Sequence, residues 1–174
     1  MRVADITFLR RSARGAEQAT ATVADPLVAT QVPINERTNA IRIRFTKPFE
    51  QNTHLPETHG LGDPDFKRHN VQVLPLQPLG GLEFVPGSLV VEAPDTVRFD
   101  LFTDSPYARG GGNGWQKGPY RIVLRGTDKP AQGRPALVDL AGKELDGEPK
   151  AAGTGVISGD GNPGGDFSAE FVVG

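Results

Sequence analysis

The segment NAIRIRF, residues 39–45, decides the fold class, because apolar and charged residues alternate along it. Successive side chains of a β-strand point to opposite faces, so Ile41, Ile43 and Phe45 would share one face and the two arginines the other. A surface helix would instead repeat its apolar residues at spacings of three and four. The segment therefore predicts a strand with one face in the core and one in water.

The same alternation recurs at residues 97–101 and 167–173, and less regular apolar segments occur at 70–76, 88–92 and 120–125. The chain contains 22 glycines and 15 prolines, about a fifth of its residues where about an eighth is usual. Both residue types favour turns and are poor helix formers. The sequence therefore predicts many short strands joined by turns and loops.

Two further segments precede this series. Val3–Leu9 and Gln18–Val23 predict a hairpin that turns across Arg11–Gly15. With it, we expect an all-β, two-sheet sandwich of about seven to nine strands. We divide the chain into an N-terminal arm or hairpin extension, residues 1–26, and a sandwich domain, residues 27–174.

Three long connections would join the strands, at residues 48–69, 103–119 and 126–165. Loops of this length in a compact domain are usually functional or mobile. They are therefore the first place to look for a binding site.

Charge and composition exclude several classes of function. The net charge is −2, from 19 basic and 21 acidic side chains that are interspersed, so no basic stripe indicates a nucleic-acid partner. The chain has no cysteine, which excludes thiol catalysis, thiolate metal sites and disulfides. The first fifteen residues lack the order of a secretory signal, and no segment is long and apolar enough to span a bilayer. We expect assembly in the cytoplasm or on a structure exported by another route.

Several segments resemble one known family. They are Ala29–Pro33, Asn39–Pro48, Tyr120–Thr127, Val138–Gly147 and Gly164–Phe171. In this order they look like the bacterial immunoglobulin-like domains of surface-layer and large extracellular proteins, the group often called Big_5 or SbsA-type. The resemblance covers about residues 27–174. It implies an immunoglobulin-like sandwich that serves as a spacer, scaffold or adhesion module and has no catalytic residues. The chain departs from this family in its N-terminal segment and in the insertion at 48–69.

Two groups of residues are candidate metal ligands. His54, His59 and His69 share one connection, but their spacing matches no metal motif, so solvated loop residues are the favoured interpretation. The turn Asp160–Asp166 places oxygen donors at Asp160, Asn162 and Asp166, which loosely resembles a calcium loop without its final glutamate. Asx turns explain the same residues and are favoured. Calcium is the one cofactor that we consider.

Tyr107 and Trp115 flank the glycine-rich run at residues 110–114. An exposed pair of aromatic side chains at the tip of a sandwich stacks on sugar rings or anchors a protein partner, whereas a buried tryptophan closes the end of the core. The buried position is favoured. The glycine-rich run lacks the lysine and the helix of a phosphate-binding loop. No nucleophile elbow is present, and the three histidines share one connection, so we do not expect an enzyme.

The leading hypothesis is a non-catalytic structural or interaction module. It would build or decorate a filament, a surface layer or a phage-tail-like contractile injection apparatus. Partners or further copies would bind through an edge strand or through residues 1–25, because an open sheet edge accepts an added strand. The alternative is a carbohydrate-binding or surface-binding adhesion domain, stabilised by calcium.

Overall fold

The computed structural model describes residues 1–50, 58–59, 69–110, 114–129, 131, 136–150 and 156–174. Its strands are β1 (Val3–Arg11), β2 (Glu17–Thr22), β3 (Thr30–Val32), β4 (Ala40–Phe45), β5 (Thr58–His59), β6 (Val71–Pro75), β7 (Gly87–Ala93), β8 (Thr96–Leu101), β9 (Gly118–Leu124) and β10 (Phe167–Val173). One short 3-10 helix, η1 (Ile34–Glu36), follows β3. In the described residues, no helix is long and apolar enough to span a membrane.

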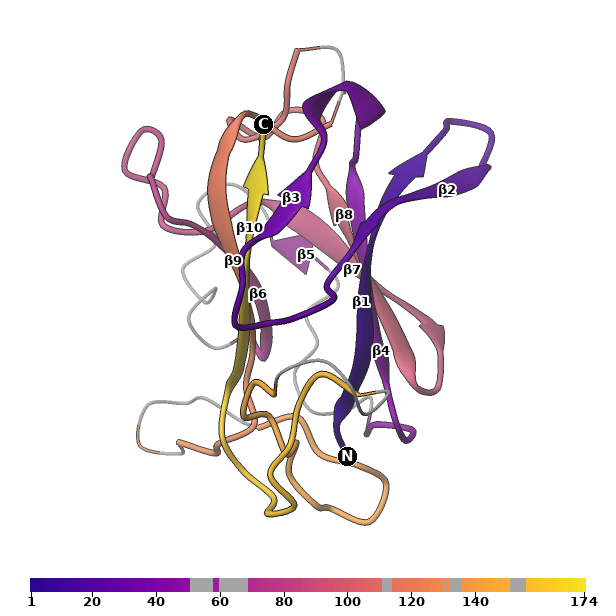
Figure 1. The fold of residues 1–174 in the computed structure, drawn as a ribbon, viewed down its shortest axis with the longest axis vertical. Coiled ribbons are helices and arrows are strands. Elements are labelled where there is room, and N and C mark those ends of the chain that lie inside the picture. Colours follow the sequence, from indigo (N-terminus) through magenta and orange to yellow (C-terminus); the bar gives the residue numbers. More distant parts are fainter. Residues whose placement is uncertain (51–57, 60–68, 111–113, 130, 132–135, 151–155) are drawn as a thin grey trace.

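The strands form two sheets that face each other (Figure 1). The larger sheet has the order β2-β1-β4-β8-β7-β5 and the smaller one the order β3-β10-β9-β6. The prediction of an all-β, two-sheet sandwich is therefore confirmed. The described residues contain nine strands of three or more residues, in addition to the two-residue β5.

The N-terminal hairpin is part of the larger sheet, and in this the structure differs from the expected extension at residues 1–26. Strand β1 pairs with β2 on one side and with β4 on the other. Its side chains Val3, Ile6 and Phe8 are fully buried in the core. Residues 1–11 therefore supply an internal strand, and only β2 lies at the edge of the sheet.

Aromatic side chains join the two sheets in the core. The rings of Phe8 on β1 and Phe171 on β10 lie 4.8 Å apart. Trp115 packs its indole against Phe171, with ring centroids 5.4 Å apart, and against Tyr120 and Phe99. The alternation read from the sequence therefore places the apolar face of each strand between the sheets.

The outer face of the larger sheet carries a network of ion pairs. Three arginines contact three carboxylates there, namely Arg11, Arg42, Arg98, Glu17, Glu92 and Asp100. The hydrogen bond from Arg42 holds the pKa of Glu17 below its ordinary value, although partial burial of the carboxylate opposes the shift. Glu17 belongs to β2 and Arg42 to β4, so the network fixes the edge strand to the rest of the sheet.

Candidate functional site

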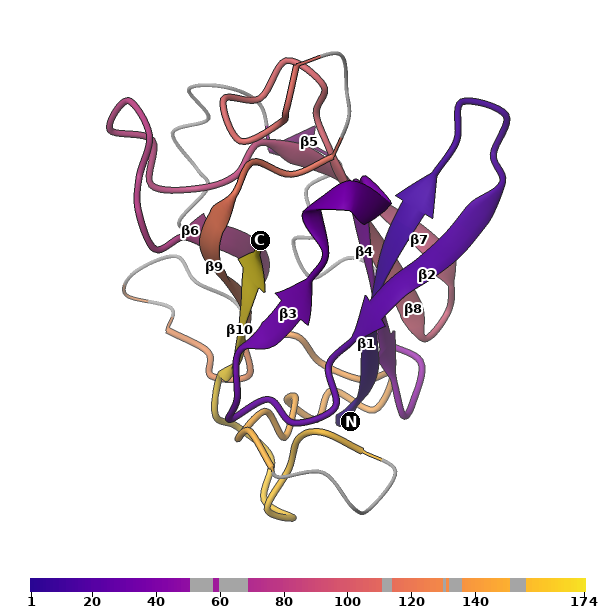
Figure 2. The same ribbon diagram turned by 45° about the horizontal axis from the view of Figure 1, so that its top comes forward.

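Two regions of the described chain present features that a folded core does not require. One is the corner formed by the connection from β9 to β10, which carries a group of acidic side chains. The other is the side of the sandwich where the edge strands β2 and β3 lie next to each other (Figure 2). The termini of these strands are joined directly by residues 23–29.

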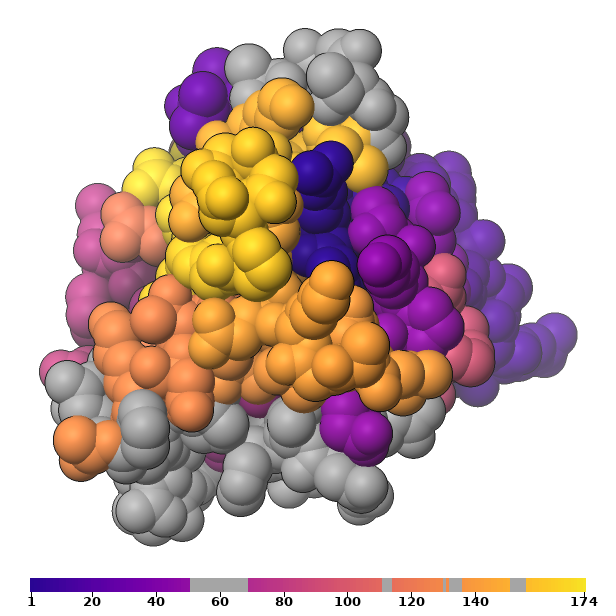
Figure 3. Space-filling view, turned by 90° about the horizontal axis from the view of Figure 1, so that it is seen from below, coloured from indigo at the N-terminus to yellow at the C-terminus, as the bar shows by residue number. Residues whose placement is uncertain are grey.

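The corner is built from aspartates that bind backbone N–H groups. Asp139 Oδ1 accepts hydrogen bonds from the N–H groups of Ala141 and Lys143. Burial raises the pKa of Asp139, but these hydrogen bonds and the nearby N-terminal ammonium more than offset burial, so the pKa lies below its ordinary value. Viewed from below, the N-terminal residues lie against this connection (Figure 3).

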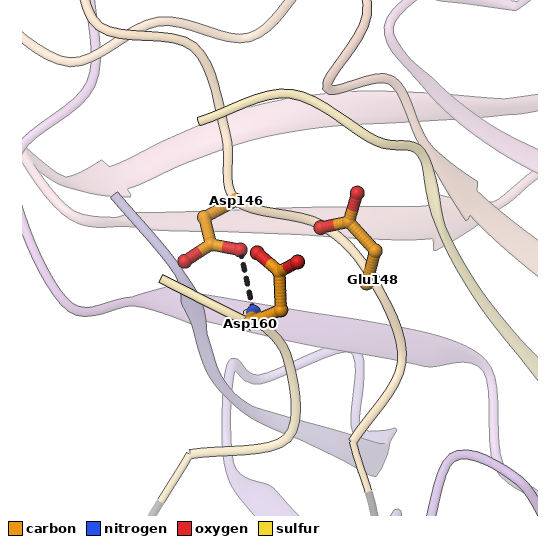
Figure 4. A group of neighbouring side chains, drawn as sticks. All are labelled: Asp146, Glu148 and Asp160. Carbon is orange, nitrogen blue, oxygen red and sulfur yellow. Dashed lines mark hydrogen bonds between the residues drawn. The ribbon is translucent and has the colours of Figure 1, made fainter. Parts of the chain in front are cut away.

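Asp146, Glu148 and Asp160 form the acidic group (Figure 4). One carboxylate oxygen from each lies within 4.8 Å of the others. Asp146 is buried, whereas Glu148 and Asp160 are exposed. Oxygen donors at this spacing are what a hard cation such as Ca²⁺ requires.

The hydrogen bonds of the group favour a structural role over a cation site. Asp146 Oδ1 accepts the N–H of Asp160, and Oδ2 accepts the N–H of Gly161 and the Nε–H of Arg2, at 2.9, 3.1 and 3.0 Å. The guanidinium of Arg2 also forms an ion pair with Asp146. It therefore supplies the positive charge that a bound cation would otherwise provide. Asp146 therefore closes the corner by joining the N-terminus of the chain to residues 160–161.

The residues of the candidate calcium turn, Asp160, Asn162 and Asp166, have two structural roles. Asp160 accepts hydrogen bonds from the backbone and the side-chain amide of Asn162, which lowers the pKa of the Asp160 carboxyl. Asp166 Oδ1 accepts the N–H groups of Gly126 and Thr127 and so joins the end of β9 to the start of β10. The favoured interpretation as an Asx turn describes Asp160 and Asn162 in the structure.

We expect Asp146→Asn to lower the free energy of unfolding by about 2 kcal/mol, because an amide leaves buried donors unsatisfied. Glu148→Gln is the matched control, since it removes an exposed charge of the same group and should change the stability by less than about 0.5 kcal/mol. Urea unfolding of both variants in EDTA measures the difference. If the group bound a cation instead, both variants would match wild type in EDTA and lose stability only relative to calcium-loaded protein.

The histidine prediction falls largely outside the described residues. His54 lies outside them, and of His59 only the backbone is described, in β5. His69 is buried two residues before β6, where its carbonyl accepts a hydrogen bond from Arg125. The histidine metal site stays a prediction.

Tyr107 and Trp115 both lie inside the protein, each 1% exposed. The hydroxyl of Tyr107 accepts the N–H of Leu79 and donates to the carbonyl of Leu82. Trp115 lies in the aromatic core described above. Neither side chain is available to stack on a sugar ring.

The open side of the sandwich holds a groove of about 550 Å³. It is lined by β2, by the connection from β2 to β3 and by β3, with mostly small or apolar side chains, among them Ala21, Val28 and Ala29. A second hollow of about 280 Å³ lies beside it and is lined in part by Leu27 and Ala29. We call β2, the connecting residues 23–29 and β3 the open side.

Leu27 and Val28 project from the open side and are 65% and 62% exposed. The turn that presents them is well defined, because Asp25 accepts the N–H of Leu27 through its side chain and that of Val28 through its carbonyl. This exposed pair could not be predicted from the sequence, since two apolar residues after a proline are equally compatible with a place in the core. The acidic group was also missed, because Asp160 is separated from Asp146 by fourteen residues.

The chain matches no protein-family model, and neither the curated proteins nor the solved structures give a significant match. The resemblance to bacterial immunoglobulin-like domains stays a prediction. The function must therefore be argued from the residues of this chain.

Proposed function

We propose that the protein is a non-catalytic structural and interaction module that binds a protein partner through its open side. The observation that carries this proposal is the exposure of Leu27 and Val28 next to the groove between β2 and β3. Large apolar side chains that are held outward beside an apolar groove are typical of protein contact sites.

The strand edges of the open side support the same function. β2 ends one sheet and β3 ends the other, so each has one side without a strand partner among the described residues. An open edge offers backbone N–H and C=O groups that an extended segment of another protein can bind. A partner therefore finds both backbone and apolar contacts in one place.

Five acidic side chains support a non-catalytic role, because their carboxylate oxygens already hold hydrogen bonds or ion pairs within the protein. Asp139, Asp146 and Asp166 bind backbone N–H groups. Glu92 and Asp100 are paired with arginines. A general acid or base has to reach a substrate with an available oxygen, and these oxygens serve the fold.

Such a module would build or decorate a larger assembly, for which a filament, a surface layer and a contractile injection apparatus are the candidates. The alternative adhesion function depended on exposed aromatic side chains, and both candidates are buried. We therefore favour a protein partner over a glycan.

Site-specific crosslinking in the producing cell tests the proposal. A photo-crosslinking amino acid at Val28 should yield one dominant protein adduct after irradiation. Leu140 is the matched control position, because it is an equally exposed apolar side chain, at 68%, in the connection from β9 to β10. Adducts at Val28 and none at Leu140 would support the open side as the contact. Equal yields at the two positions, or none at Val28, would count against it.

A further inference from the structure

The outer edge of β2 has backbone groups that point away from the protein. The carbonyl of Leu9 accepts the N–H of Asn39, and both backbone groups of Arg11 bind the side chain of Asn39. Leu9 and Arg11 therefore direct their backbone groups toward β4 and not toward β2. Their partners on β2 are Ala19 and Glu17. By the alternation of an antiparallel ladder, Ala19 and Glu17 direct their own N–H and C=O groups outward.

The same reasoning applies to the other end of the strand. Val23 donates its N–H to Ile6, so its neighbour Thr22 faces outward. The outer edge thus presents the backbone donors and acceptors of Glu17, Ala19 and Thr22, on the two sides of a bulge at Thr20. An extended backbone segment of another chain can form hydrogen bonds with these groups.

The side chains of β2 offer little protection against strand pairing. Natural edge strands are commonly blocked by lysine, proline, inward-pointing charges or β-bulges, and of these devices β2 has the bulge at Thr20. After Glu17, β2 reads Gln-Ala-Thr-Ala-Thr, which is uncharged, lacks proline and is mostly exposed. The β1–β2 hairpin also projects from the body of the sandwich (Figure 1), so a second strand can approach it.

Charges at the two ends of β2 favour a second copy of this chain as the occupant. Arg14 lies in the exposed turn before β2, and Asp25 lies three residues beyond its end. If two β2 strands pair in antiparallel orientation, the Arg14 end of each copy lies against the Asp25 end of the other. Opposite charges then meet at both ends of the pair, as two-fold symmetry requires.

We propose that two copies of this protein associate by antiparallel pairing of their β2 strands, which joins the two larger sheets into one continuous sheet. This inference rests on the proposed function, since it names the partner of the open side. β3 is the less suitable edge, because it has three residues against six. The side chains of Leu27 and Val28 would lie next to the hairpin turn of the other copy.

Sedimentation of the purified protein from about 1 µM to about 1 mM tests the inference. The mass should rise from monomer to dimer with concentration. Ala19→Pro removes an outward N–H without affecting a hydrogen bond to β1, so it should abolish the dimer. Ala19→Thr keeps the N–H and should dimerise as wild type does. Amide exchange of wild-type protein at Glu17, Ala19 and Thr22 should slow at least tenfold at the high concentration. If the proline variant fails to fold, this measurement tests the pairing of the β2 strands by itself.

A wild-type protein that stays monomeric throughout, or a proline variant that dimerises normally, would overturn the inference. The proposed function has a different failure. If the protein stays monomeric but still forms adducts at Val28 with another protein, then that other protein is the partner of the open side and the proposed function stands. If the protein dimerises but forms no such adducts, the self-association stands and binding of another protein at the open side does not.

Discussion

Deletion of residues 1–25 should yield a chain that does not fold. The deletion removes β1, which lies between β2 and β4 in the larger sheet. It also removes Phe8, whose ring contacts Phe171 of the opposite sheet. An arm attached to a finished sandwich would be dispensable, and this segment is not.

The expected loss exceeds what a domain of this size tolerates. Four large apolar side chains of β1 are buried, namely Val3, Ile6, Phe8 and Leu9. Together they contribute about 6–12 kcal/mol of hydrophobic free energy, whereas a whole domain is stable by about 5–15 kcal/mol. The deletion also opens the backbone edge of β4, which invites aggregation.

Circular dichroism and urea titration of the truncated chain measure this effect, and we expect no cooperative unfolding transition. The control shortens only the exposed turn Ser12–Gly15 to Asn-Gly, which joins two antiparallel strands well. That variant should unfold cooperatively, near the wild-type midpoint. A truncated chain with a sharp transition would show that β1 is not needed for the core.

The strands could be predicted from the sequence because their signal is local. Residues 39–45, 97–101 and 167–173 show the alternation that one buried face requires, and they form β4, β8 and β10. The hairpin of β1 and β2 was also predicted. The position of this hairpin within the larger sheet could not be predicted, because alternation shows that a strand has one buried face but does not identify the neighbouring strands.

The candidate sites depend on contacts between distant residues, and so they could be predicted only in part. Asp160 was recognised as a turn residue, but its approach to Asp146 follows from the path of the whole corner. Trp115 next to a glycine-rich run is compatible with an exposed loop or a core position. The structure shows why it is buried: Gly114 lies so close to Thr38 that a Cβ atom would be 2.5 Å from its carbonyl oxygen. This contact holds Gly114 against the residues that join η1 to β4.

The corner from β9 to β10 is fixed by close contact between glycine backbones. A Cβ atom on Gly126 would lie 1.9 Å from the carbonyl oxygen of Gly165 and 2.6 Å from that of Leu145. A Cβ atom on Gly147 would lie 2.2 Å from the same oxygen of Gly165. Because these neighbours are backbone atoms, they cannot move aside without moving the strands. Glycine is therefore required at positions 126 and 147, because a Cβ atom at either position would clash with the backbone.

Gly126→Ala should lower the free energy of unfolding by about 3 kcal/mol or more, since the added methyl group forces β9 and β10 apart. For a domain of this length, the melting temperature should fall by about 6–12 °C. Gly110→Ala is the matched control, because no atom lies within 4 Å of its added Cβ, and it should melt within about 2 °C of wild type. Thermal unfolding of the three proteins measures the difference. Equal melting temperatures for Gly126→Ala and Gly110→Ala would mean that the corner can relax around the added methyl group, and close backbone contact would then not require glycine at position 126.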